Sequence, residues 1–219
     1  MSGGLALVYR GPASLPGCPE AVAQLLERSG RFDRVRYVGP HAATPLGAAV
    51  LGGATLYAQP GGGDLRPAYR RLRRHAAAVR DFVVSGGRYL GFCLGAYLAG
   101  RPGFGLLPGD ADQYIASDGA TVRHADDTIV TVRWRGRPRQ VFFQDGPCFL
   151  LAPGGDAVVL AEYDNGRPAA VVARYGRGVV GVVGPHPEAT PDWFTDAGLP
   201  VPPPATDLGL DLLEAVLST

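Results

Sequence analysis

The sequence predicts an α/β protein built on a doubly wound, mostly parallel β-sheet with helices on both faces. Short apolar runs typical of buried parallel strands alternate with helical patterns through the first hundred residues. The region from about 104 to 150 instead contains β-rich segments separated by polar turns, which indicates a small antiparallel excursion. With 219 residues, 46% of them hydrophobic, the chain can bury such a core, and we expect one domain over residues 1–219.

Strands and helices follow one another in the first half of the chain. The expected elements are a strand over 5–9, a helix over 19–29, strands over 35–38 and 54–58, a helix over 66–84 and a strand over 88–92. Gly86 and Gly87 end the long helix, because glycine readily adopts the left-handed conformation found there. This alternation predicts parallel strands joined by crossover helices.

The second half begins with the antiparallel excursion and then returns to the core. The expected elements are strands over 121–123, 128–134, 140–143, 157–161, 169–173 and 178–183, a proline-rich loop over 200–204 and a helix over 207–217. No internal repeat or domain linker interrupts this pattern.

Composition excludes several classes of function. The formal net charge of +1 predicts no strong attraction to nucleic acid or to an anionic membrane. No apolar run reaches the roughly 18 residues that span a bilayer, and no signal peptide is visible, so we expect a cytoplasmic protein. Three cysteines without paired spacing argue against a disulfide framework or a structural zinc site. The absence of lysine excludes a Schiff base with pyridoxal phosphate, and we expect neither cofactor nor metal.

Cys93 is the candidate nucleophile. It follows the strand over 88–92 and lies between Gly91 and Gly95, which makes Gly-x-Cys-x-Gly, the cysteine form of a nucleophile elbow. Glycines at these positions remove the β-carbons that would clash in so sharp a turn, and the N-terminus of the following helix favours a thiolate. A buried structural cysteine at a tight turn is the alternative, because free cysteines are commonly buried.

His186 and Glu188 follow the strand over 178–183. Because the carboxyl ends of parallel strands converge at one edge of a sheet, we expect both residues to lie near Cys93. A cysteine nucleophile needs a base, and the base needs an acceptor that fixes its tautomer. Taken alone, a histidine at a strand end is more often structural.

A glycine-rich loop follows the third strand. Gly61 and Gly62 lie in Pro-Gly-Gly-Gly, where backbone N–H groups can approach a developing oxyanion, with the N–H of Leu94 as the second donor. The alternatives are a flexible turn or an anion-binding nest without catalysis.

These motifs, in this order, resemble the class I glutamine amidotransferase-like superfamily. More narrowly, the blocks at 9–12, 60–64, 85–97 and 184–188 resemble the biotin-protein ligase N-terminal-domain family. The resemblance implies a flavodoxin-like fold and a catalytic triad of Cys93, His186 and Glu188. It implies a hydrolase or an acyl- or amido-transferase that acts on an amide or ester through a thioester.

Two departures from the family pattern bear on the substrate. Glutamine-using members carry His-Gln where this chain has Ala96 and Tyr97, so we expect Tyr97 in the substrate pocket and a substrate other than free glutamine. The narrower family carries Asn-Gly-Gly where this chain has residues 144–147, Gln-Asp-Gly-Pro, which we expect to line the pocket. The sequence contains no recognisable ligase catalytic domain, so the resemblance does not imply biotin ligase activity. The expected partners are a small-molecule amide or carboxylate and either a second copy of the chain or a separate acceptor or synthetase protein.

Two other functions stay open. A catalytically silent module could bind a small ligand in the same pocket. A thiol redox sensor could oxidise Cys93 beside Glu20, although the position of Glu20 in the first turn of a helix is sufficient structural reason for it.

Other polar and thiol groups are expected to lie outside the site. Cys18 and Cys148 are interpreted as free thiols in loops, and the arginines over 70–74 as a solvated helix face. The alternating arginines over 133–139 could meet an anionic ligand.

Overall fold

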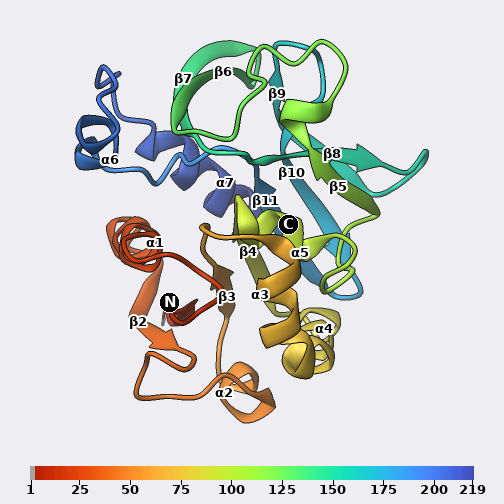
Figure 1. Cartoon of the computed structure of the whole chain (residues 1–219). Coiled ribbons are helices and arrows are strands. Elements are labelled where there is room, and N and C mark those ends of the chain that lie inside the picture. Colours follow the sequence, from red (N-terminus) through yellow and green to blue (C-terminus); the bar gives the residue numbers. More distant parts are fainter. Residues whose placement is uncertain (1–2) are drawn as a thin grey trace.

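The computed structural model describes residues 3–219, and nine strands form one twisted sheet with helices on both faces (Figure 1). The order of strands in this sheet is β2-β1-β3-β4-β11-β10-β9-β6-β7. Its strands are β1 (Gly4–Tyr9), β2 (Phe32–Val38), β3 (Leu56–Gln59), β4 (Arg88–Phe92), β6 (Thr128–Trp134), β7 (Arg137–Phe143), β9 (Ala157–Tyr163), β10 (Pro168–Tyr175) and β11 (Gly178–Val183). The α/β fold class predicted from the sequence is confirmed.

Five neighbouring strands, from β2 to β11, are parallel. They are connected by helices as in a doubly wound sheet, where a ligand site lies beyond the carboxyl ends of the strands. The helices of the molecule are α1 (Cys18–Arg28), α2 (Ala48–Gly52), α3 (Leu65–Leu72), α4 (Ala76–Val84), α5 (Leu94–Ala99), α6 (Pro191–Asp196) and α7 (Thr206–Ser218).

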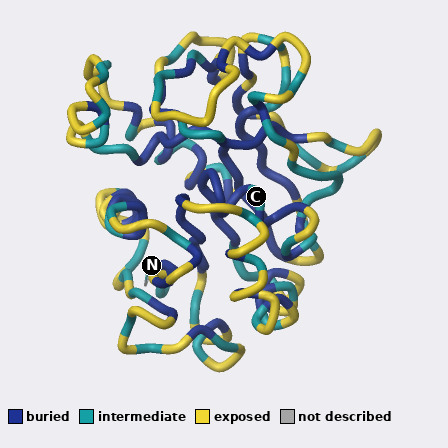
Figure 2. The backbone as a smooth tube through the Cα atoms, viewed as in Figure 1, coloured by how far each residue is buried: buried dark blue, intermediate teal, exposed yellow. Residues whose placement is uncertain are grey.

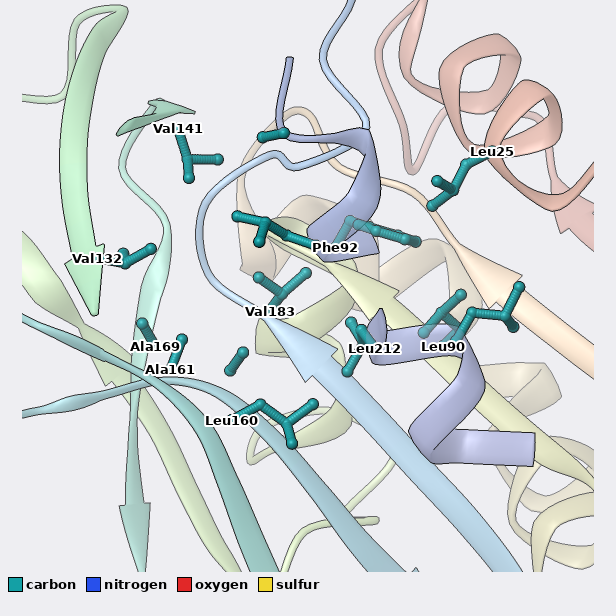
Figure 3. Packing of buried hydrophobic residues seen from close by; sticks show 14 of the residues in the cluster. Leu25, Leu90, Phe92, Val132, Val141, Leu160, Ala161, Ala169, Val183 and Leu212 are labelled. Atoms are coloured by element: carbon teal, nitrogen blue, oxygen red, sulfur yellow. The ribbon is translucent and has the colours of Figure 1, made fainter. Parts of the chain in front are cut away.

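Alternate side chains of each parallel strand enter two hydrophobic layers. Ala6 and Val8 of β1 pack in a layer with α1 and α7, whereas Leu7 and Tyr9 pack with α4 and α5 on the other face. Figure 3 shows the first layer, which reaches from Leu25 of α1 past Phe92 at the end of β4 to the antiparallel strands. Burial follows the sheet and the inner faces of the helices (Figure 2). The last residues of β4 are therefore held firmly from both sides.

The remaining strands of the large sheet, β10, β9, β6 and β7, are antiparallel, and β7 forms its edge. Two further strands, β5 (Gly109–Gln113) and β8 (Pro147–Leu151), pair separately as a small second sheet. The antiparallel part predicted for residues 104–150 thus divides between the main sheet and this second sheet.

Besides β8, α2 and α6, which were not predicted, three elements differ from the sequence prediction. The expected strand over 121–123 is absent, because this short segment lies between turns and its backbone is held by the Tyr114 hydroxyl, to which Thr121 N–H donates at 3.1 Å. The expected long helix is interrupted by a 3₁₀ turn, Arg73–His75, a common connector between α-helical segments. The strand β5 was not predicted, since Gly-Asp-Ala-Asp-Gln has low β-propensity and becomes a strand only by pairing with β8.

Within residues 3–219, none of the helices combines the length and hydropathy needed to cross a membrane.

Candidate active site

Cys93 lies at the sharp turn between β4 and α5. Its backbone has φ 46° and ψ −105°, a positive φ that is uncommon outside glycine and costs about 1–3 kcal/mol. A β-carbon on Gly91 would lie 2.6 Å from Gly95 O, and one on Gly95 would lie 1.9 Å from Gln59 O. Both flanking glycines are therefore required by close backbone approach, as the elbow pattern predicts.

His186 and Glu188 form a buried pair directly after β11. His186 Nδ1 and Glu188 Oε1 lie 2.8 Å apart, and both side chains are almost fully inaccessible. The backbone N–H of His186 donates to Phe142 O at 2.8 Å, and the Phe142 ring packs edge-on against the imidazole. The end of the antiparallel strand β7 thus fixes His186, which follows the parallel strand β11.

The structure brings Cys93 and His186 together across Gly61. A β-carbon on Gly61 would lie 2.5 Å from His186 Cε1 and 3.2 Å from Cys93 Cβ, so both side chains pack on one face of this glycine. Burial of the imidazole opposes its protonation, but the Glu188 carboxylate and the Cys93 sulfur outweigh this effect and raise the pKa of His186 to about 10. At neutral pH the ring is therefore protonated and can donate a proton beside Cys93.

The glycine loop after β3 lies beside the same turn. Gly62 has φ 93°, a backbone conformation that favours glycine, and lies against Leu15. Gln59, at the end of β3, anchors the start of this loop. Its buried side chain accepts a hydrogen bond from the Tyr57 hydroxyl at 2.7 Å and donates one to Ala13 O at 2.9 Å.

Two N–H groups near Cys93 remain free for a ligand. Among the described residues, neither the N–H of Gly62 nor that of Leu94 donates an intramolecular hydrogen bond. These are the two donors that the sequence predicted for an oxyanion hole, and they stay available for one.

The antiparallel half supplies the opposite wall of the site. Cys93 Sγ donates to Gln144 O at 3.5 Å, and the Tyr97 hydroxyl donates to Asp145 O at 3.1 Å. Gln113 of β5 holds the Asp145 carboxylate through its side-chain amide. Tyr97, Gln113, Gln144 and Asp145 line a cavity of about 920 Å³ together with Cys93 and residues 62–64 of the glycine loop. Gln144 and Asp145 therefore line the pocket, as expected for residues 144–147, whereas Gly146 and Pro147 are not among its lining residues.

Gln113, Asp112 and Asp64 are among the cavity residues that sequence reasoning missed. Gln113 lies in a strand that was not predicted, and Asp64 stands only as the last residue of the glycine-rich block. Only the block that contains Asp64 carried a signal in the sequence.

Glu20 has a structural role. Its carboxylate accepts from Gly17 N–H at 3.0 Å in a capping box at the start of α1, and it pairs with Arg10 at 2.8 Å. Both carboxylate oxygens of Glu20 are therefore engaged by Gly17 and Arg10. This arrangement does not favour Glu20 as the acidic partner of an oxidised Cys93.

The arginines set aside from the site are mostly structural or solvated. Arg135 pairs with Asp211 and Arg139 with Asp207 of α7, so these two side chains hold the helix against the sheet edge. The arginines over 70–74 are exposed, as predicted.

The other two cysteines are free and buried. Burial raises the pKa of Cys18, with the nearby Glu188 carboxylate adding to the effect, and it also raises the pKa of Cys148. The prediction that both lie in loops was wrong: Cys18 begins α1 and Cys148 belongs to β8, because pairing with β5 extends a strand beyond its turn-like sequence.

Over residues 3–219, no group of three or more His, Cys, Asp or Glu side chains is arranged to hold a metal ion.

The family model described as "Biotin-protein ligase, N terminal" matches residues 7–102. The resemblance predicted from the sequence is confirmed over this segment. It includes the glycine loop and the turn at Cys93, but neither His186 nor Glu188. A search of curated protein sequences finds no match.

Solved structures share the fold over nearly the whole chain. A glutamine amidotransferase superposes with a TM-score of 0.61 at 20% identity, covering 90% of this chain and 100% of that one. A cytoplasmic protein from Salmonella typhimurium superposes with a TM-score of 0.59 at 14% identity, covering 96% of this chain and 98% of that one. A β-galactosidase from Bacillus circulans gives 0.52 at 16% identity, and there the match covers 98% of this chain but only 30% of the other. The chain therefore has a glutamine amidotransferase-like fold.

Proposed function

We propose that this protein is a cysteine-dependent hydrolase or acyl- or amido-transferase that acts on an amide or ester of a small molecule. The observation that carries the proposal is the buried hydrogen bond between His186 and Glu188, 2.8 Å long, beside Cys93. A cysteine nucleophile needs a base whose tautomer is fixed by an acceptor, and these three side chains supply the roles.

The reaction begins with attack of the Cys93 thiolate on the carbonyl carbon. A C–S bond forms while the carbonyl electron pair moves to oxygen, where the N–H groups of Leu94 and Gly62 stabilise the negative charge. As the C–N or C–O bond breaks, His186 transfers the Nε2 proton to the departing amine or alcohol, and a thioester remains. Glu188 stays ionised and holds the ring through Nδ1.

The thioester is then consumed by water or by an acceptor amine. Neutral His186 takes a proton from the attacking group, the new C–O or C–N bond forms, and the C–S bond breaks to restore the thiolate. An amine acceptor would come from a separate acceptor or synthetase protein, a partner that stays a prediction.

The proposed substrate is not free glutamine. Ala96 and Tyr97 replace the His-Gln of glutamine-using relatives, and Tyr97 directs its hydroxyl to Asp145 O at 3.1 Å. This departure supports a different amide or ester in the same pocket.

Labelling by iodoacetamide at neutral pH, followed by intact-mass spectrometry, tests the proposal. We expect one rapid adduct that is lost in Cys93→Ser and slowed about 100-fold or more in His186→Gln. Cys18→Ser and Cys148→Ser are matched controls and should keep the adduct, because burial raises the pKa of both thiols. Equal labelling of the wild type and Cys93→Ser would overturn the proposal.

A further inference from the structure

The cavity over Cys93 carries an uneven charge. Three carboxylates line it, from Asp64 after the glycine loop, Asp112 of β5 and Asp145 of the loop before β8. Because Cys93 also lines this cavity, the cavity is the place where a substrate of the proposed reaction would bind.

Asp145 directly follows a residue whose backbone contacts the Cys93 sulfur. The residue before it, Gln144, places its carbonyl oxygen 3.5 Å from Cys93 Sγ. Gln113 Nε2 bonds both oxygens of Asp145, at 2.8 and 2.9 Å, which fixes the carboxylate and leaves lone pairs on each oxygen for another donor. The group is thus pre-oriented and half-buried rather than loose on the surface.

Neither Asp145 nor Asp64 forms an ion pair with a side chain within residues 3–219. Asp64 begins α3 without a side-chain capping bond, and neither carboxylate forms an ion pair in this part of the chain. Arg66 and Arg101 also line the cavity and, like Asp64 and Asp112, are exposed, but neither arginine forms an ion pair with Asp145 or Asp64. Burial raises the pKa of Asp145; the Gln113 hydrogen bond opposes this shift and the Asp64 carboxylate adds to it. A bound cation would relieve this repulsion.

We infer that the substrate carries a cationic amine, amidine or guanidinium group a few bonds from its reacting carbonyl, and that Asp145 and Asp64 bind this group. The inference rests on the proposed function, because it requires the substrate to reach Cys93. A cation is favoured over a neutral donor because two carboxylates line the cavity without an ion-pair partner, and charge-assisted hydrogen bonds are stronger than neutral ones.

Three chloromethyl probes of similar size and different charge test the inference. Chloroacetamide is neutral, 2-chloroacetamidine is cationic and chloroacetate is anionic, and the alkylation rate of Cys93 by each is divided by its rate with 2-mercaptoethanol. We expect the normalised rate to be highest for the cation and lowest for the anion. The preference for cation over amide should fall about three- to tenfold in Asp145→Asn and less in Asp64→Asn, since each change removes one nearby charge.

The variants are chosen to preserve the fold. Asparagine, like aspartate, tolerates the φ of 45° at position 145, and the Asp64 side chain makes no hydrogen bond to lose. Asp156→Asn, an exposed carboxylate outside the cavity, is the matched control and should leave the preference unchanged.

Two failures can be told apart. Normal alkylation of Cys93 by chloroacetamide, with the same charge preference in the wild type and Asp145→Asn, would overturn this inference alone. Absence of selective alkylation of Cys93 by all three probes would overturn the proposed function, and the inference with it.

Discussion

The parallel and antiparallel halves of the sheet contribute differently to the site. The parallel strands β3, β4 and β11 end in the glycine loop, Cys93 and the His186–Glu188 pair, and each of these lies in a recognisable sequence block. The antiparallel half contributes Phe142, which holds His186, together with Gln144, which contacts Cys93, and Asp145, which lines the same cavity. The groups proposed to carry out the reaction thus come from the parallel half. Most of the groups that position them or contact the substrate come from the antiparallel half.

This division follows from the geometry of the two kinds of strand. Parallel strands direct all their carboxyl ends to one edge, so short motifs after successive strands meet there without further instruction. The carboxyl ends of antiparallel strands lie alternately at the two edges of the sheet. Which of their loops lie near the site is therefore decided by strand register and tertiary packing. A change in the antiparallel half should therefore alter the site by loosening it, whereas a change at the glycines should alter the turn itself.

The largest effect on stability is expected for Phe142→Ala. Phe142 is 5% exposed and packs edge-on against His186, Trp193 and Phe194, so its truncation should cost about 3–5 kcal/mol of unfolding free energy. Urea unfolding measures this loss, and the rate at which iodoacetamide labels Cys93 should fall.

Phe82→Ala supplies the comparison for Phe142→Ala. Phe82 is similarly buried but lies on α4, away from the site. It should lose stability while keeping Cys93 labelling. If both variants slow labelling to the same degree, Phe142 has no special role in holding His186.

An intermediate effect is expected for Gly95→Ala. The added β-carbon would lie 1.9 Å from Gln59 O, a backbone atom that cannot move aside cheaply, so we expect a loss of about 1–3 kcal/mol. Because the turn must open, labelling of Cys93 should fall as well. Gly52→Ala, where a new β-carbon meets nothing within 4 Å, should be neutral or slightly stabilising in thermal unfolding. An unchanged labelling rate in Gly95→Ala would contradict the tight turn.

A pH-dependent effect on stability is expected for Glu188→Gln, which removes the charge partner of His186. In the wild type the pKa of His186 is raised to about 10, so its contribution to stability is complete below about pH 6.5 and is lost as the pH rises through about 10. Removing the carboxylate should lower the pKa of His186 by about one to three units and flatten this loss. NMR titration of the His186 ring measures the change, and Glu162→Gln, at an exposed position on β9, is the control. A titration unchanged by Glu188→Gln would rule out the carboxylate as the cause.

Much of the parallel half could be predicted from the sequence. Continuous apolar runs identify its strands, and glycines at 91 and 95 indicate the turn at Cys93 because only a missing β-carbon permits the close approach seen there. Cys93, His186 and Glu188 were identified from their positions after strands, and the structure brings them together. What these residues catalyse stays a proposal.

The antiparallel half was predicted less well, for a physical reason. Residues 121–123 have high β-propensity yet form no strand, whereas the polar β5 becomes one because β8 pairs with it. Gln113, which holds Asp145, could not be found because its role depends on that pairing. The sequence by itself determined the fold class and the groups at the strand ends, since both depend on local patterns. Only the tertiary structure decided which carboxylates face Cys93 and which residues fix His186, since those contacts join segments whose pairing has no local signal.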